Sequence, residues 1–166
     1  VAINQLNEIR NHQMQIRLEL SAARQETDAF EVLDHIDKVR SSIFQVDNLL
    51  TAYKERDINA EEKQMLETFI ADRLNFGRVG VIPTMDLVQE EKFSQADKLR
   101  KDALDPAFKK ASQSIDNLIQ YQVSNAKNEF ERVNKLTKTI RIVSIASIVA
   151  GLVLVVLIGL VITRSI

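Results

Sequence analysis

The chain has 166 residues, a net charge of −1, no cysteine, no tryptophan, four glycines and two prolines. So few glycines and prolines exclude an all-β protein, because its many tight turns need those residues. The lack of cysteine excludes disulfide bonds, thiolate metal sites and a cysteine nucleophile. The near-zero net charge argues against nucleic acid as a partner. What remains is a helical, charge-balanced protein.

The first two helices are predicted by apolar residues that recur every three or four positions, the spacing of a helix–helix seam. The first helix runs from the start of the chain to about Glu26, and the second from about residue 29 to 56. Asp28-Ala-Phe-Glu31 has the form of a capping box. There the Asp side chain accepts from the N3 amide and the Glu reaches back. The apolar positions are Leu6, Ile9, Ile16, Leu20 and Ala23 in the first helix and Ile36, Val39, Ile43, Val46, Leu50 and Tyr53 in the second.

The third helix opens at a second capping signature, Asn59-Ala-Glu-Glu62. Gly77, Gly80 and Pro83 then fall close together, and a proline inside a helix removes a hydrogen bond and clashes with the preceding turn. We expect a kink there rather than an end, because apolar residues resume the helical spacing after Pro83. A turn at 91–93 should close this helix.

A short helical piece at 94–103 precedes the fourth helix, which we expect to start at Asp105 and Pro106. Asp is a good N-cap residue, and Pro suits the first helical position. The helical pattern after Pro106 carries no stop signal. Four amphipathic helices with short connections predict an all-α, up-down-up-down four-helix bundle over residues 1–139.

The C-terminal part of the chain has the composition of a membrane helix. All 23 acidic residues lie at or before Glu131, and the 21 residues 142–162 carry no charge. As a helix they span roughly 30 Å, the thickness of the hydrocarbon core of a bilayer. A buried core helix is the alternative, but such helices rarely stay apolar on every face for so long. We therefore predict a transmembrane helix at 140–163 in contact with membrane lipid, into which the fourth helix continues.

The sequence offers no catalytic residues. His12 and His35 lie on different predicted helices, and neither has a partner at metal-binding spacing. The glycines at 77 and 80 lie in a helical pattern and lack the Lys-Ser/Thr ending of a phosphate loop. We predict no enzyme activity, no metal and no cofactor.

Three arginines on the first helix are the main candidate for ligand binding. Arg10, Arg17 and Arg24 recur every seven residues, each directly after an apolar seam position. They therefore flank a helix–helix contact, where they either form interhelical salt bridges or, in paired subunits, surround an anionic ligand. The second possibility suits arginine, whose planar fork binds a carboxylate through two hydrogen bonds.

Other polar residues interrupt the predicted core or lie near the predicted kink. Gln13 occupies a seam position where an aliphatic residue is expected, and Gln122 and Asn125 interrupt the fourth helix. Such breaks mark register control or a pocket. Arg73 and Arg78 are weaker ligand candidates, because arginines at such places are more often surface residues.

The chain resembles the sensory module of bacterial methyl-accepting chemotaxis receptors of the four-helix-bundle type. The resemblance covers essentially the whole chain and is carried by the pattern of five segments. These are Leu6-Asn-Glu-Ile-Arg-Asn11, Glu61-Glu62, Ile82-Pro83, Leu118-Ile-Gln-Tyr-Gln-Val-Ser-Asn-Ala-Lys127 and Ile162-Thr-Arg-Ser-Ile166.

The resemblance implies a receptor in the bacterial inner membrane whose bundle lies in the periplasm. Such a bundle forms a homodimer, binds a small chemoeffector near its membrane-distal end, and passes a displacement of the fourth helix through the membrane. Residues 164–166 would begin a cytoplasmic linker domain, and partners that couple to a kinase would act only beyond Ile166.

The resemblance also implies where the ligand binds. In aspartate-type receptors, arginines of the first helix from both subunits hold the ligand carboxylates. The counterparts in kind are Arg10, Arg17 and Arg24, of which Arg17 and Arg24 are favoured because Arg10 is furthest from the distal turn, and the expected chemoeffector is an organic acid. The even seven-residue spacing departs from the closer clustering in those receptors.

Two other functions fit the same helices. One is a membrane-tethered structural or adaptor bundle that binds a partner protein, which predicts an exposed apolar patch and no small-molecule pocket. The other is the ectodomain of a sensor histidine kinase, which differs from a chemotaxis receptor in the domains on the C-terminal side of the membrane helix.

Overall fold

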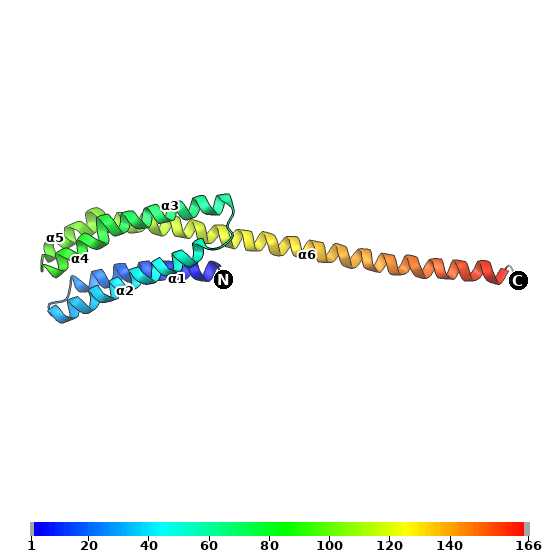
Figure 1. The fold of residues 1–166 in the computed structure, drawn as a ribbon, viewed down its shortest axis with the longest axis horizontal. Coiled ribbons are helices and arrows are strands. Elements are labelled where there is room, and N and C mark those ends of the chain that lie inside the picture. The colour runs from blue at the N-terminus through cyan, green and yellow to red at the C-terminus, as the bar shows by residue number, and fades with distance from the viewer. Residues whose placement is uncertain (1, 165–166) are drawn as a thin grey trace. The chain divides into compact units, whose positions relative to one another are not determined.

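The computed structural model describes the backbone of residues 2–164 and the side chains of residues 2–148 and 151. The described residues are helical throughout apart from short connections, and they contain no strand (Figure 1). The all-α prediction is therefore confirmed. The helices are α1 (Ala2–Ala23), α2 (Ala29–Lys54), α3 (Ala60–Phe76), the π-helix η1 (Gly77–Val81), α4 (Ile82–Gln89), α5 (Phe93–Leu99), the π-helix η2 (Arg100–Leu104) and α6 (Asp105–Arg164).

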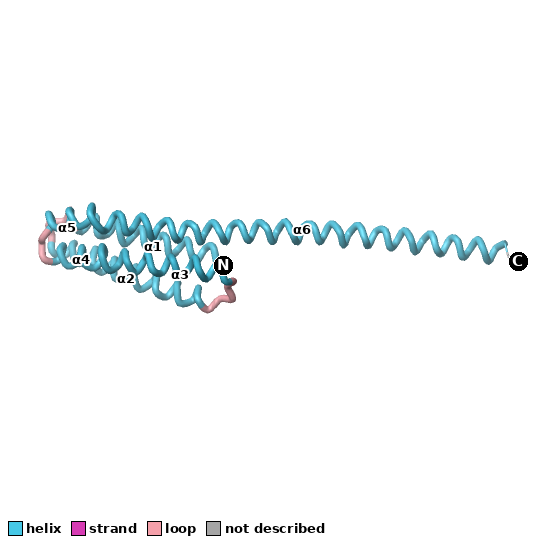
Figure 2. The backbone as a smooth tube through the Cα atoms, turned by 90° about the horizontal axis from the view of Figure 1, so that it is seen from above, coloured by secondary structure: helices cyan, strands magenta, loops and turns pink. Residues whose placement is uncertain are grey.

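The chain up to Val123 forms one compact unit, and the residues from Ser124 onward form a second. In the first unit four helical rods lie side by side: α1, α2, α3 with η1 and α4, and α5 with η2 and the start of α6 (Figures 1 and 2). The α2–α3 loop lies at the same end as the start of α1, and the α1–α2 and α4–α5 loops lie at the other end. This is the predicted four-helix bundle.

The core of the bundle consists of two apolar clusters. One lies toward the α1–α2 loop and contains Leu20, Ile36, Phe76 and Leu104, and the other contains Leu6, Tyr53, Phe69 and Ile115. Every predicted apolar seam position of α1 and α2 is buried except Ile43, which is half-buried. On α1 the buried residue between Ile9 of one cluster and Ile16 of the other is Gln13.

Both predicted capping signatures begin at the observed N-cap residue, but only that of Asn59 has the predicted bond from the N3 amide. Asn59 accepts a hydrogen bond from the N3 amide of Glu62 at 2.9 Å, and Asp28 accepts from the N2 amide of Phe30 at 2.8 Å instead of from Glu31. The prediction of a reciprocal bond in the Asp28 box is wrong, because the Asp28 amide donates to the Glu26 side chain. The Glu62 side chain accepts from the buried Tyr53 hydroxyl.

Two π-helices replace the predicted kink and the predicted start of the fourth helix. η1 and η2 each have five residues, and a proline is the second residue after each, Pro83 and Pro106. A π-turn shifts backbone bonding to residues five apart, which accommodates a residue that has no amide to donate. Asp105 therefore lies inside a continuous helical stretch, its backbone amide donating to the Arg100 carbonyl, and the prediction of an N-cap at Asp105 is wrong.

The two π-helices pack against each other at a glycine. A Cβ atom built on Gly80 of η1 would lie 2.8 Å from Leu104 Cδ1 and 2.9 Å from Leu104 Cα of η2. Only a residue without a side chain permits so close an approach of the two backbones. Gly80 therefore sets the spacing between the third and fourth rods of the bundle.

In the second unit, α6 carries exposed apolar side chains at helical spacing. Phe130, Val133, Leu136 and Ile140 continue the apolar pattern of the fourth helix, and all four are exposed. Among the described residues, no helix combines the length and the apolar character needed to cross a membrane. Most side chains of the predicted span 140–163, and residues 165–166 of the predicted linker start, lie outside the described part of the chain.

Candidate functional site

The three arginines that recur every seven residues each pair with an aspartate of the fourth rod; Arg10 and Arg17 lie on α1, and Arg24 directly follows it. Arg10 Nη1 lies 3.2 Å from Asp116 Oδ1, and Arg17 Nε lies 3.0 Å from Asp105 Oδ1. Arg24 Nη1 lies 2.6 Å from Asp97 Oδ1. The structure thus contains the interhelical salt bridges that the spacing predicts as one of two possibilities. The ligand-binding role of the same arginines stays a prediction.

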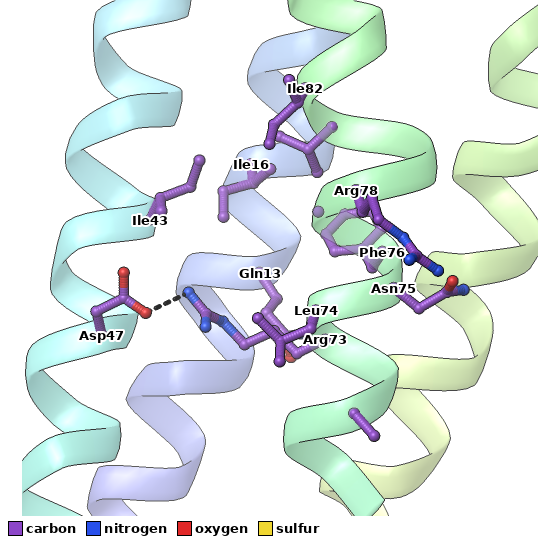
Figure 3. Close-up of a pocket in the computed structure, with 13 residues that line it drawn as sticks. Gln13, Ile16, Ile43, Asp47, Arg73, Leu74, Asn75, Phe76, Arg78 and Ile82 are labelled. Atoms are coloured by element: carbon purple, nitrogen blue, oxygen red, sulfur yellow. Dashed lines mark ion pairs between the residues drawn. The ribbon is translucent and has the colours of Figure 1, made fainter.

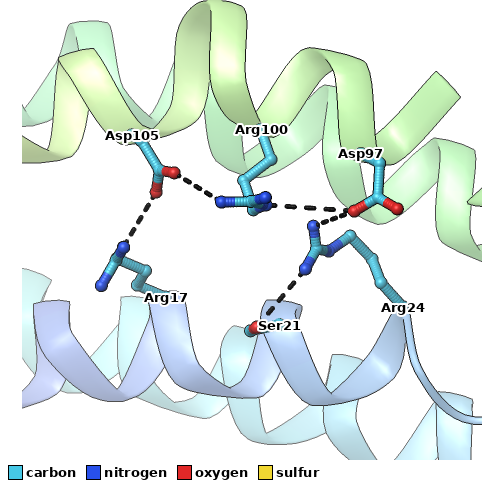
Figure 4. Close-up of polar contacts among 6 residues, drawn as sticks. All are labelled: Arg17, Ser21, Arg24, Asp97, Arg100 and Asp105. Atoms are coloured by element: carbon cyan, nitrogen blue, oxygen red, sulfur yellow. Dashed lines mark hydrogen bonds and ion pairs between the residues drawn. The ribbon is translucent and has the colours of Figure 1, made fainter. Parts of the chain in front are cut away.

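Four of these groups join a fifth, Arg100, in one network (Figure 4). Arg100 Nη1 lies 2.8 Å from Asp105 Oδ2, and Arg100 Nε lies 3.9 Å from Asp97 Oδ1. The order along the network is Arg17, Asp105, Arg100, Asp97 and Arg24, so three guanidinium groups face two carboxylates. The network therefore carries an excess of one positive charge near the α1–α2 loop end of the bundle.

The network also contains hydrogen-bond donors that have no acceptor among the described residues. The Arg24 side chain is 6% exposed, and its Nη2 donates to Ser21 Oγ at 3.4 Å. The buried Nε groups of Arg24 and Arg100 have no hydrogen-bond partner among the described residues. Buried donors without a partner are costly, so an anion that supplied acceptor oxygens here would gain from them.

Arg17 also contacts the Phe108 ring, which belongs to an aromatic pair. The Arg17 guanidinium lies 5.0 Å from the centre of the Phe108 ring, a cation–π contact, and Phe108 packs against Phe76 with ring centres 5.6 Å apart. This contact does not depend on Asp105. Arg17 therefore keeps one neighbour that holds it in place if its carboxylate partner moves.

Sequence reasoning does not identify Asp97, Arg100 and Asp105 as members of the site. It assigns Asp105 to a helix cap, and the two others lie on a segment whose place in the bundle it leaves open. One signal in the sequence could have found the two aspartates. Where arginines repeat along one helix, acidic residues are expected on the helix that packs against it. Arg10 lies apart from this network, and both members of its ion pair are exposed.

The other two predicted arginines, Arg73 and Arg78, lie on the third rod, away from the arginine network. Arg73 Nη2 lies 2.8 Å from Asp47 Oδ1 of α2, and Arg78 is on η1 (Figure 3). Both line a pocket of about 550 Å³ between α1, α2 and the third rod, and no residue of α5 or α6 lines it. The structure does not bring all five predicted arginines together. Gln13 lines this pocket, whereas Gln122 and Asn125 are half-buried and line none of the described pockets.

A buried acid lies at the opposite end of the bundle from the arginine network. Tyr53 Oη donates to Glu62 Oε1 at 2.7 Å, and both side chains are buried. Burial raises the pKa of the Tyr53 hydroxyl well above its ordinary value, and the hydrogen bond to Glu62 raises it further. The hydroxyl is therefore protonated and serves as the donor that satisfies Glu62, which is a structural role.

No curated protein and no solved structure matches the chain significantly. A family model does match: residues 1–126 fit TarH, the Tar ligand binding domain homologue. The match includes the whole bundle and all five candidate arginines, and it confirms the resemblance to a chemotaxis receptor sensory module. The chain belongs to the TarH family of ligand-binding domains.

Proposed function

We propose that this chain is the sensing and transmembrane signalling part of a bacterial chemotaxis receptor, and that it binds a small organic acid through Arg17 and Arg24. The observation that carries the proposal is the network of three arginines and two aspartates on a chain of the ligand-binding family. The network has one unmatched positive charge and two unpartnered guanidinium donors among the described residues. A carboxylate supplies both the charge and the acceptors that are missing.

The binding unit is a homodimer that pairs through α1. Met14 and Leu18 lie exposed on α1 between the arginines, with 43% and 57% of their surfaces accessible. A two-fold contact places the same patch of both copies face to face, so it would bring Arg17 and Arg24 of two subunits toward one ligand. The exposed apolar residues of α6 from Phe130 to Ile140 have the three- and four-residue spacing of a second helix–helix seam and support pairing there as well.

The signal arises from competition between carboxylates. A ligand that takes hydrogen bonds from Arg17 and Arg24 does so at the expense of Asp105 and Asp97. These aspartates belong to the fourth rod, so their release loosens one of the connections between that rod and α1. A ligand shifts a population between two arrangements only through its different affinity for them, and the loss or retention of these ion pairs supplies that difference.

The displaced element is α6, which is helical from Asp105 to Arg164. We place its residues 140–163 across the inner membrane, the bundle in the periplasm, and residues 164–166 at the start of a cytoplasmic linker. Support comes from the 21 uncharged residues 142–162 and from the helical backbone there. Kinase coupling then belongs to parts of the receptor beyond Ile166.

Thermal unfolding of the chain in detergent micelles, with a panel of organic acids, tests this function. A ligand that binds only the folded protein raises the unfolding midpoint, by about 2.7 kcal/mol of stability at a hundred times its dissociation constant. We expect a di- or tricarboxylate to raise the midpoint of the wild type and to raise the midpoint of Arg17→Ala by clearly less. Failure of every acid at high concentration, with the dimer intact, would overturn the proposal.

A second function is favoured by one observation on α2. The large apolar residues Phe30, Leu33 and Phe44 are exposed there, and exposed apolar surface is typical of a site that binds protein. An adaptor bundle would use this surface and would show no midpoint shift with any small acid. The thermal panel therefore separates the two functions.

A further inference from the structure

Gln13 is a buried polar residue whose side-chain amide lacks hydrogen bonds within the described part of the chain. Its side chain is 2% exposed, and neither the amide oxygen nor the amide nitrogen has a hydrogen-bond partner among the described residues. Buried polar side chains almost always have partners, and one that lacks them destabilises the fold. A leucine at this position would extend the apolar seam of α1. The stability of the bundle therefore does not explain why this position is a glutamine.

The explanation lies in the pocket that Gln13 lines. The pocket has a volume of about 550 Å³, within the usual range for small-molecule sites. Its walls are mostly apolar, with Ile16, Ile43 and Phe76 among them, and polar or charged residues also line it: Asp47, Arg73, Asn75 and Arg78. Figure 3 shows Gln13 extending from α1 toward the third rod, near Arg73 and Leu74. Among the polar residues that line this pocket, Gln13 is the one that is fully buried.

Three charged residues line this pocket, and none is hydrogen-bonded to Gln13. Arg73 is held by Asp47 at 2.8 Å, and the third of them, Arg78, is exposed. The pocket is lined from α1, α2 and the third rod, whereas the acids that pair with Arg17 and Arg24 come from the fourth rod. It lies within one subunit and is separate from the arginine network.

We propose that this pocket binds a neutral small molecule with an apolar body and a carboxamide or lactam head. A glutamine amide presents an acceptor oxygen beside donor hydrogens, and another amide matches it with a donor and an acceptor in the same arrangement. A carboxylate has acceptors alone and would leave the glutamine oxygen without a donor. The apolar walls enclose the body of the ligand, and the paired amides satisfy both Gln13 atoms.

Calorimetric titration of phenylacetamide into the full chain in detergent micelles tests the proposal, with empty micelles as the reference. We expect saturable binding to the wild type and binding weaker by roughly tenfold or more in Gln13→Leu. The matched control is Gln15→Leu, because Gln15 is exposed on the same helix and its loss should leave binding unchanged. Phenylacetate, which differs only in the head group, should bind more weakly than the amide.

A second set of variants tests whether a loss of binding is caused by a loss of the folded structure. Gln13→Leu should unfold at a higher temperature than the wild type, since it removes an unsatisfied buried group, so lost binding there is not lost structure. Ile43→Trp should block the pocket from α2, and Arg17→Ala should leave phenylacetamide binding intact. Absence of binding to the wild type, or equal binding to wild type and Gln13→Leu, would overturn the inference without touching the organic-acid proposal.

Discussion

At one end of the bundle, the buried side chains of Tyr53 and Glu62 are joined by a hydrogen bond. The sequence predicts that Glu62 completes a helix cap, yet its side chain turns inward and accepts from the Tyr53 hydroxyl at 2.7 Å. The local sequence favours the cap, but the buried tyrosine is a partner that only the folded bundle provides. A buried carboxylate needs such a partner, because water does not reach it.

Replacement of Tyr53 by Phe should destabilise the bundle by about 1–3 kcal/mol, since it leaves the buried Glu62 without its donor. Urea unfolding followed by circular dichroism measures this loss. Tyr121→Phe is the matched control, because the Tyr121 hydroxyl donates to Asn59 at 3.0 Å in an exposed position. The control should lose clearly less stability, and equal losses in the two variants would contradict the structural role of the buried pair.

The same pair makes stability depend on alkaline pH. The folded-state pKa of Tyr53 is raised above its ordinary value of 10.0, so the folded protein holds the phenolic proton more tightly than the unfolded chain. The stabilisation is complete below pH 10 and is lost as the pH rises from there toward the folded pKa. The free energy of unfolding should therefore fall above about pH 10 more steeply in the wild type than in Tyr53→Phe.

At the scale of helices, the predictions that succeed rest on local rules. The starts of α2 and α3 follow from N-cap residues, and the buried faces of α1 and α2 follow from apolar spacing, both of which act within a turn or two of the chain. The π-helices are not predictable in that way. Gly77, Gly80 and the prolines are ambiguous locally, and what decides between a kink, a break and a π-turn is the packing of η1 on η2.

The contact between the π-helices yields a matched pair of substitutions. Gly80→Ala should destabilise the bundle by about 1–3 kcal/mol, because its Cβ would fall 2.9 Å from the Leu104 Cα, a backbone atom that cannot move aside alone. Gly77→Ala, on the same π-helix, meets nothing within 4 Å and should be neutral or stabilising by up to about 1 kcal/mol. Thermal or urea unfolding of the two variants compares them directly. A stable Gly80→Ala protein would show that the rods do not depend on this close approach.

For the whole molecule, the sequence predicts the bundle and the family but only two of the five members of the arginine network, Arg17 and Arg24. The arginine repeat is visible because it follows the seven-residue period of one helix. The aspartates that face it come from positions 97, 105 and 116, which share no period with the arginines or with each other. Their proximity is a consequence of how the fourth rod packs, including its π-turn, and such contacts are not encoded in any short segment.

Competition between an organic acid and Asp105 for Arg17 is the centre of the proposed mechanism. Two substitutions in that one ion pair should therefore have opposite effects on binding. Arg17→Ala removes a ligand contact and should weaken binding by roughly tenfold or more, as loss of a charge-assisted hydrogen bond does. Asp105→Asn removes the internal competitor and should strengthen binding severalfold. Asp116→Asn is the control, because its partner Arg10 lies apart from the network.

Isothermal titration calorimetry of the acid selected by the thermal panel, against the wild type and these three variants, is the most direct measurement. We predict that affinity rises in Asp105→Asn, falls in Arg17→Ala and stays unchanged in Asp116→Asn. Weaker binding in Asp105→Asn, or unchanged binding in Arg17→Ala, would contradict the competition mechanism and place the acid elsewhere on the bundle.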